Sequence, residues 1–102
     1  MKQFALFFLL LLVIQGNAQV AKVGGIVIDN QENAPIIGAT VFLQNESMKQ
    51  GVSSNERGLF FFDSIPYGEY TLTISSVGFK KVKQTVLVDK SRNFLRKIPM
   101  EV

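Results

Sequence analysis

The chain has 102 residues, a formal net charge of +3, and neither histidine nor cysteine. This length allows one domain, and so small a net charge does not indicate nucleic-acid binding. The two missing residue types exclude the usual general base, a thiol nucleophile, disulfide bonds and the commonest transition-metal ligands.

The first 18 residues have the pattern of an export signal. Lys2 supplies a positive charge, residues 4–14 form an unbroken apolar run, and Gly16 and Ala18 place small residues where a signal peptidase reads. From position 4 to position 14 the run holds 11 residues, whereas a membrane-spanning helix needs about 20. A cleaved signal peptide is therefore favoured over an N-terminal anchor. We predict cleavage after Ala18, which leaves residues 19–102 as one exported domain.

The exported part begins with short predicted β-strands. Residues 22–29 are rich in β-branched apolar side chains, and the paired Gly24 and Gly25 predict a bulge or a close approach of another backbone segment. Residues 39–44 place Ala39, Val41 and Leu43 on one side, which is typical of a strand with one buried face. Residues 51–54 predict a brief third strand.

A polar loop between the first two predicted strands holds the one cluster of side chains that could bind calcium. Asp29, Asn30, Glu32 and Asn33 carry oxygen atoms of the kind that calcium prefers, but their order does not fit an EF-hand loop. Asp and Asn are also common in turns, where their side chains accept hydrogen bonds from nearby backbone N–H groups. We therefore predict a turn at this loop, and no metal or other cofactor.

The clearest pattern lies in the middle of the chain. After a tight turn at residues 55–58, an apolar run at residues 59–62 is followed by turn-forming residues 63–68 and then by a strictly alternating run. We interpret these segments as a β-hairpin. The side chains predicted to form its buried face are Phe60, Phe62, Tyr70, Leu72 and Ile74.

Two further runs, residues 82–88 and residues 93–102, also repeat with a period of two. Phe94 and Ile98 share the apolar side of the second run, with Arg96 as an exception. We expect each run to be a strand with one buried face, and Phe94 to lie in the core.

Together these patterns predict seven strands. Parallel pairing needs crossover connections of a dozen or more residues, which this chain lacks, so we predict antiparallel pairing. Two sheets packed face to face bury both apolar columns, and a partly open barrel is the competing arrangement. The predicted fold of residues 19–102 is an all-β, seven-stranded antiparallel β-sandwich.

Five segments follow one another in the order and spacing of a known family pattern. The chain resembles the carboxypeptidase regulatory-like domain, a transthyretin-like (prealbumin-like) sandwich of seven strands. In particular, it is similar to the version at the N-terminus of TonB-dependent outer-membrane receptors of the Bacteroidetes. The segments that carry the resemblance are GIVID (25–29), PIIGATV (35–41), SNERGLF (54–60), IPYGEYTL (65–72) and VGF (77–79).

The resemblance implies a non-catalytic accessory domain of outer-membrane nutrient transport, in the periplasm or at the periplasmic face of the outer membrane. Its partners would be proteins of the uptake machinery, either a receptor plug and barrel or energy-transducing components, with no nucleic acid. It would meet the membrane only through an associated receptor. The chain would be either the N-terminal module of a receptor or a stand-alone copy. The alternative is a periplasmic carbohydrate-binding or adhesin-like sandwich.

Four residues are candidates for an interaction surface. Phe42 and Phe61 lie on the parity opposite to the predicted core, so they would be exposed if no other layer covers their sheet. Lys81 and Lys83 belong to a basic last third. It indicates either a docking face for an acidic partner or anionic lipid head groups, or lysines that protect strand edges from aggregation. We favour the second interpretation of the lysines. No serine has an evident base partner, so no catalytic residue is expected.

Overall fold

A computed structural model describes residues 19–102, and the predicted signal segment with its cleavage site after Ala18 lies outside the described residues. This part of the chain contains seven strands, as predicted, and no helix in it could span a bilayer. The strands are, in chain order, β1 (Val20–Asp29), β2 (Thr40–Gln44), β3 (Lys49–Ser53), β4 (Leu59–Pro66), β5 (Gly68–Ser75), β6 (Val82–Val88) and β7 (Arg92–Met100).

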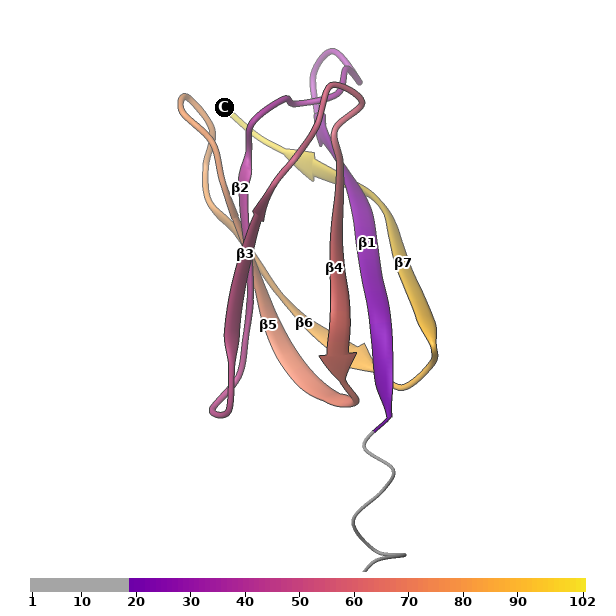
Figure 1. Ribbon diagram of the computed structural model, residues 1–102. Helices are drawn as coiled ribbons and strands as arrows, with labels where there is room; N and C mark the ends of the chain where they lie inside the picture. Colours follow the sequence, from indigo (N-terminus) through magenta and orange to yellow (C-terminus); the bar gives the residue numbers. More distant parts are fainter. Residues whose placement is uncertain (1–18) are drawn as a thin grey trace, which may run out of the picture.

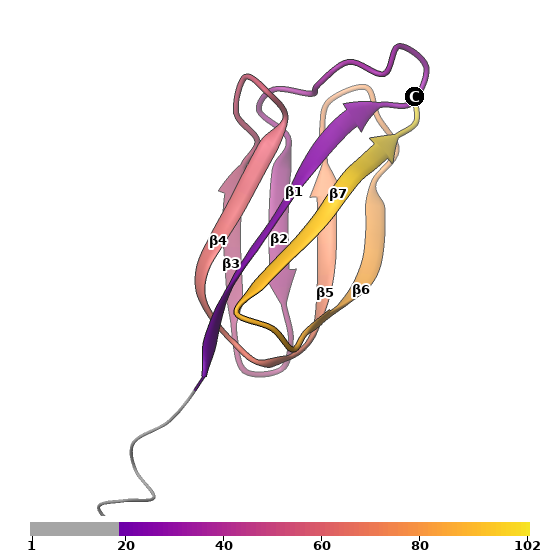
Figure 2. The same cartoon turned by 90° about the vertical axis from the view of Figure 1, so that its right-hand side faces the viewer.

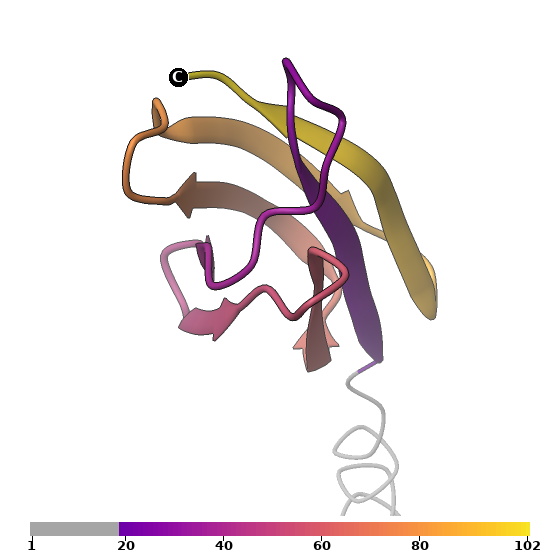
Figure 3. The same ribbon diagram turned by 90° about the horizontal axis from the view of Figure 1, so that it is seen from above.

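The strands form two sheets that pack face to face. One sheet has three strands in the order β4-β1-β7, and the other has four in the order β3-β2-β5-β6. Figure 1 shows the two layers from the side, and Figure 3 shows them from above. β2 and β5 alternate buried side chains with less buried ones, and buried apolar side chains from both sheets meet in one core. The predicted sandwich is confirmed.

The prediction that all strands pair antiparallel was wrong for one pair. β1 and β7 run parallel along most of their lengths, and they lie side by side in Figure 2. The prediction considered only the short connections between successive strands. β1 and β7 are the first and last strands, so the five strands between them serve as the long crossover that parallel pairing needs.

The predicted hairpin at the centre of the chain was also wrong, although both of its arms are strands. β4 pairs with β1 in one sheet, whereas β5 pairs with β2 and β6 in the other. The chain crosses between the sheets at Tyr67, which lies between the two strands. Before the crossing, Ser64 has a φ of 57° within a bulge where the register of β4 against β1 shifts. The turn-forming residues therefore bend one strand and redirect the chain to the opposite layer.

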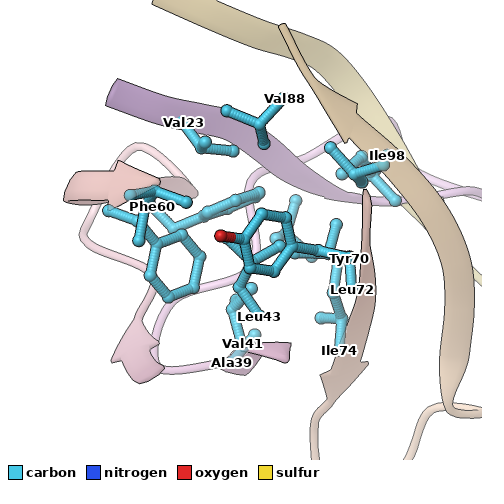
Figure 4. Close-up of a cluster of buried hydrophobic side chains, with 14 of the residues drawn as sticks. Val23, Ala39, Val41, Leu43, Phe60, Tyr70, Leu72, Ile74, Val88 and Ile98 are labelled. Atoms are coloured by element: carbon cyan, nitrogen blue, oxygen red, sulfur yellow. The ribbon is translucent and has the colours of Figure 1, made fainter. Parts of the chain in front are cut away.

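The core contains the apolar columns predicted from the alternating strands. Phe60 and Phe62 of β4 are 1% and 2% exposed, and their rings meet edge to face with centroids 6.1 Å apart. Burying a side chain of this size contributes roughly 1.5 to 3 kcal/mol. Tyr70 is buried too, and its hydroxyl donates a 2.6 Å hydrogen bond to the carbonyl oxygen of Pro66. Figure 4 shows residues from both sheets converging on this cluster.

Phe94 does not lie in this core, contrary to the prediction. Gly25 of β1 faces two residues of β7, Leu95 and Arg96, because the register between the strands shifts there. Arg96 has a φ of 57°, a left-handed conformation that accommodates the extra residue. The insertion reverses which side chains point inward, so Leu95 packs against the core and Phe94 is 53% exposed.

The predicted tight turn before β4 is confirmed and is tied to the neighbouring strand β1. The Gly58 backbone N–H bonds to the carbonyl oxygen of Asn55 at 2.9 Å, and the Val27 N–H of β1 bonds to the Gly58 carbonyl at 2.8 Å. Gly58 has a φ of 75°, and a Cβ atom there would lie 2.5 Å from the Val27 carbonyl oxygen. Only glycine fits such a close, left-handed position.

Candidate interaction surface

The described residues 19–102 hold no group of three or more acidic side chains placed to bind a metal ion. In the loop after β1, the Asp29 carboxylate Oδ1 accepts a hydrogen bond from the Gln31 backbone N–H at 2.9 Å. Asn33 adopts a φ of 57° and its N–H bonds to the Asp29 carbonyl at 2.8 Å. These bonds confirm the predicted turn, in which the side chain of Asp29 closes the loop.

Ser54 is a buried serine whose hydroxyl joins two segments of backbone. Its Oγ accepts a hydrogen bond from the Ala39 N–H at 2.9 Å and donates one to the Ile36 carbonyl oxygen at 2.6 Å. The sequence predicts this serine at the end of a brief third strand, and does not predict its burial. Because both hydrogen-bonding functions of the hydroxyl are used within the fold, Ser54 has a structural role.

Phe61, Gly24 and Phe94 form a row across the outer face of the three-stranded sheet. Gly24, in the central strand, pairs with Phe61 of β4 on one side and with Phe94 of β7 on the other. A Cβ atom at position 24 would lie 2.8 Å from Cδ1 of Phe61, so glycine leaves room between the rings. The three residues line a mostly apolar hollow of about 240 Å³. We call it the aromatic hollow.

The aromatic hollow is open to solvent. Phe61 is 58% exposed and Phe94 is 53% exposed, and no described element lies in front of this sheet in Figure 2. The expectation that Phe61 is exposed if its sheet has no cover is therefore met. Two large aromatic side chains exposed together mark an interaction site more strongly than one exposed residue does.

Basic side chains border the aromatic hollow. Lys22 and Arg92 are opposite each other in the register of β1 and β7, two residues before Gly24 and Phe94. Both side chains are exposed, and both residues line the hollow. In the next row on the opposite side, Lys97 is exposed beside the central strand. The bulge in β4 places Asp63 opposite Lys22, where its Oδ1 accepts a 2.8 Å hydrogen bond from the backbone N–H that follows it. The border thus carries three basic residues against one acidic residue.

The other aromatic candidate, Phe42, lies on the outer face of the four-stranded sheet. It is half-buried, and the Lys49 ammonium Nζ lies 4.5 Å from the centroid of its ring. This cation–π contact covers part of the ring. Thr73 pairs with Phe42 on one side and with Lys83 on the other, and the exposed Lys81 precedes β6. Phe42 therefore offers less open apolar surface than Phe61.

The structure does not bring the four sequence candidates together. Phe61 lies on the three-stranded sheet, and the other three residues lie on or beside the four-stranded sheet, which forms the opposite layer (Figure 2). Sequence reasoning missed Phe94 because it assigned this residue to the core. The signal that could have revealed it is Arg96, the one polar residue that interrupts the apolar column of β7.

The architecture defines a prealbumin-like β-sandwich domain. The model of the CarboxypepD_reg-like domain family matches residues 23–100, and the chain belongs to this family. Domains of this kind are generally non-catalytic. A comparison with curated protein sequences found no match.

Solved structures share this fold at low sequence identity. The Bacillus anthracis TIE protein is 17% identical with a TM-score of 0.69, and the match covers 80% of this chain and 16% of that protein. The group B streptococcus pilus 2b backbone protein is 12% identical with a TM-score of 0.67, over 81% of this chain and 41% of that one. The chain therefore spans less than half the length of either protein.

A third similar structure has nearly the same extent as this domain. The 5-hydroxyisourate hydrolase of Klebsiella pneumoniae is 18% identical with a TM-score of 0.62, and the match covers 78% of this chain and 90% of the hydrolase. At such identities, these likenesses show the shared fold alone.

Proposed function

We propose that this chain is a non-catalytic, protein-binding domain of outer-membrane nutrient transport, and that it contacts its partner through the aromatic hollow. The observation that carries the proposal is the row of Phe61, Gly24 and Phe94, in which two rings are more than half exposed on an uncovered sheet face. Exposed aromatic residues around a depression are typical anchors of protein interfaces.

Binding, and not turnover, is the activity that the side chains of the hollow support. Its lining offers two aromatic rings, a glycine, Lys22, Arg92 and Asn93 as accessible groups. Acyl or glycosyl transfer requires a nucleophile or carboxylate pair with an aligned acid or base. The lining contains no carboxylate, and the bordering Asp63 accepts a hydrogen bond from the backbone N–H of Ser64 in its own bulge. The hollow can bury apolar surface, which drives association.

A protein partner fits the hollow better than a carbohydrate does. Sugar recognition needs polar side chains that point at the ligand as well as aromatic surface. Asn93 is the one amide side chain of the lining, and its Nδ2 donates a hydrogen bond of 2.8 Å to the Lys90 carbonyl and one of 3.4 Å to the Lys22 carbonyl. Both amide hydrogens are therefore used within the domain.

The transport context is supported by the sequence. The chain belongs to the CarboxypepD_reg-like family, and its five segments resemble the version of the domain that precedes TonB-dependent receptors. The predicted signal peptide would deliver the domain to the periplasm, where the uptake machinery is accessible. The partner in this proposal is a receptor or an energy-transducing component of that machinery.

Site-specific photo-crosslinking tests the proposal. A photoreactive phenylalanine analogue is placed at position 61 or 94 of the full chain, in cells that contain the complete uptake system. We expect a crosslink to a TonB-dependent receptor or an energy-transducing protein, identified by mass spectrometry. Position 83, on the opposite sheet, is the matched control and should give no such product.

Two results would overturn the proposal. Equal crosslinking from positions 61 and 83 would mean that the hollow is not the contact surface. Binding of the purified protein to a glycan array, abolished by Phe61→Ser together with Phe94→Ser, would instead establish the carbohydrate-binding alternative.

A further inference from the structure

We propose that the aromatic hollow binds an extended acidic segment of the partner protein, in which one apolar side chain is flanked by an acidic residue two positions away on each side. This inference rests on the proposed function and specifies the chemistry of the partner. It follows from the arrangement of charges along the sheet, which the aromatic rings alone do not determine.

The basic residues lie on both sides of the hollow along the strand direction. In the register of β1 against β7, Lys22 pairs with Arg92, Gly24 with Phe94, and Ile26 with Lys97. The charged rows are therefore two residues of β1 away from the aromatic row on either side. At about 3.3 Å per residue, each charged row lies roughly 6.6 Å from the centre of the hollow.

An extended peptide has the same spacing. Its side chains alternate between two faces, so residues i−2, i and i+2 point the same way at intervals of roughly 6.6 Å. If residue i places an apolar side chain between Phe61 and Phe94, acidic residues at i−2 and i+2 meet the basic rows. Acidic residues at i−1 and i+1 would point away from the sheet. The spacing of the charges therefore selects a specific pattern.

The sign of the charge identifies an acidic partner. The border of the hollow carries Lys22, Arg92 and Lys97 against Asp63, and all four side chains are exposed. Asp63 reduces the positive charge only in the row of Lys22, because it lies opposite that residue. Complementary charges at an interface border set the orientation of a partner and raise its association rate.

Two synthetic peptides of identical composition test the spacing. The peptide Gly-Glu-Ser-Phe-Ser-Glu-Gly has its acidic residues two positions from the phenylalanine, and the isomer Gly-Ser-Glu-Phe-Glu-Ser-Gly has them one position away. Each is titrated into the isotopically labelled protein, purified after expression of the full chain, while NMR records the backbone amides of Gly24, Phe61 and Phe94. We expect the first peptide to shift these amides and to bind at least about 2-fold more tightly, since each exposed ion pair contributes a factor of about 1.4 to 5.

Salt and charge reversal provide the matched controls. The tighter binding of the first peptide relative to its isomer should vanish at about 1 M salt, where the screening length falls to about 3 Å. Arg92→Glu and Lys97→Glu should each weaken binding of the first peptide, whereas Lys83→Glu on the other sheet should leave it unchanged. Equal affinities of the two peptides would overturn the inference. It would also be overturned if the NMR signals of these amides shifted with protein concentration when no peptide is present.

Failure of this inference can be told apart from failure of the proposed function. Photo-crosslinking from position 61 is repeated in the chain that carries both Arg92→Glu and Lys97→Glu. If the crosslink to the uptake protein persists at full yield, the hollow is the contact surface but the acidic pattern is wrong. If the chain that carries the photoreactive residue but no charge reversal gives no crosslink, the proposed function itself fails. Loss of the crosslink only in the charge-reversed chain supports both.

Discussion

The ring of Phe60 lies so close to Gly25 of the neighbouring strand that a Cβ atom at position 25 would fall 2.7 Å from Cζ of the ring. Gly25 is buried in the central strand β1, and Phe60 is buried against Phe62 in β4. The paired glycines predicted a bulge or a close approach of another backbone segment. The register against β7 does shift at this point, whereas the close neighbour of Gly25 is the side-chain ring of Phe60.

We expect Gly25→Ala to destabilise the domain by about 1 to 3 kcal/mol, because the enclosed ring has no free space to move into. Gly51→Ala is the matched control. There a Cβ atom would also fall 2.7 Å from a ring carbon, Cε1 of Phe42, but that ring is half-buried at the surface and can turn outward. The cost at position 51 should stay below about 1 kcal/mol. Urea denaturation measures both, and equal costs would contradict the explanation.

Adjacent phenylalanines on β4 should differ sharply in their effect on stability. Phe60→Ala removes a ring that is 1% exposed, and large-to-small core substitutions of this kind cost about 3 to 5 kcal/mol. Phe61→Ala removes a ring on the solvent side of the same strand and should cost less than about 1 kcal/mol. Thermal unfolding followed by circular dichroism checks both. A Phe60→Ala cost below about 1 kcal/mol would show that this ring is not in the core.

The buried hydroxyl of Ser54 should contribute measurably to stability. Ser54→Ala leaves the Ala39 N–H and the Ile36 carbonyl oxygen without the bonds that this hydroxyl makes. Leaving a buried polar group unsatisfied costs about 1 to 3 kcal/mol, so the free energy of unfolding should fall by that amount. Ser53→Ala, at an exposed neighbouring position, should change it by no more than about 0.5 kcal/mol. A neutral Ser54→Ala would mean that water replaces both bonds.

Arg96 should tolerate glycine and resist a β-branched residue. Its left-handed φ of 57° costs an L-residue about 1 to 2 kcal/mol, which glycine avoids while losing about 0.5 to 1 kcal/mol in chain entropy. Arg96→Gly should therefore be neutral or stabilising by up to about 1 kcal/mol, and Arg96→Ile should destabilise by at least about 1 kcal/mol. Chemical denaturation measures both variants, and the reverse order would argue against a bulge at this position.

Much of the local structure could be predicted from period-two patterns, because alternation records which side of a strand is buried. Tyr70, Leu72 and Ile74 alternate without interruption, and all three are buried in β5 as predicted. The prediction failed at Phe94, where the bulge at Arg96 inserts a residue and shifts the parity. Arg96 interrupts the apolar column at this point, but periodicity by itself does not show that such an interruption is an inserted residue.

The candidate surface was only partly predictable for a related reason. Phe61 could be proposed from its parity, but its exposure depended on whether another layer covers the sheet. Its neighbours in the aromatic hollow are distant in sequence, since Gly24 and Phe94 belong to the first and last strands. Sequence reasoning could not join these positions without the pairing of β1 with both β4 and β7.

The amino-acid sequence alone determined the all-β class, the number of strands and most of the buried side chains. Burial of one strand face requires apolar residues at every second position, and this alternation can be read from residues close together in the chain. Tertiary structure alone decided that β4 and β5 enter different sheets, that β1 and β7 run parallel, and that Phe61 and Phe94 meet beside Gly24. Strand pairing joins segments that are far apart in the chain, and it depends on how both layers pack together. The local alternation of apolar and polar residues carries no information about that packing.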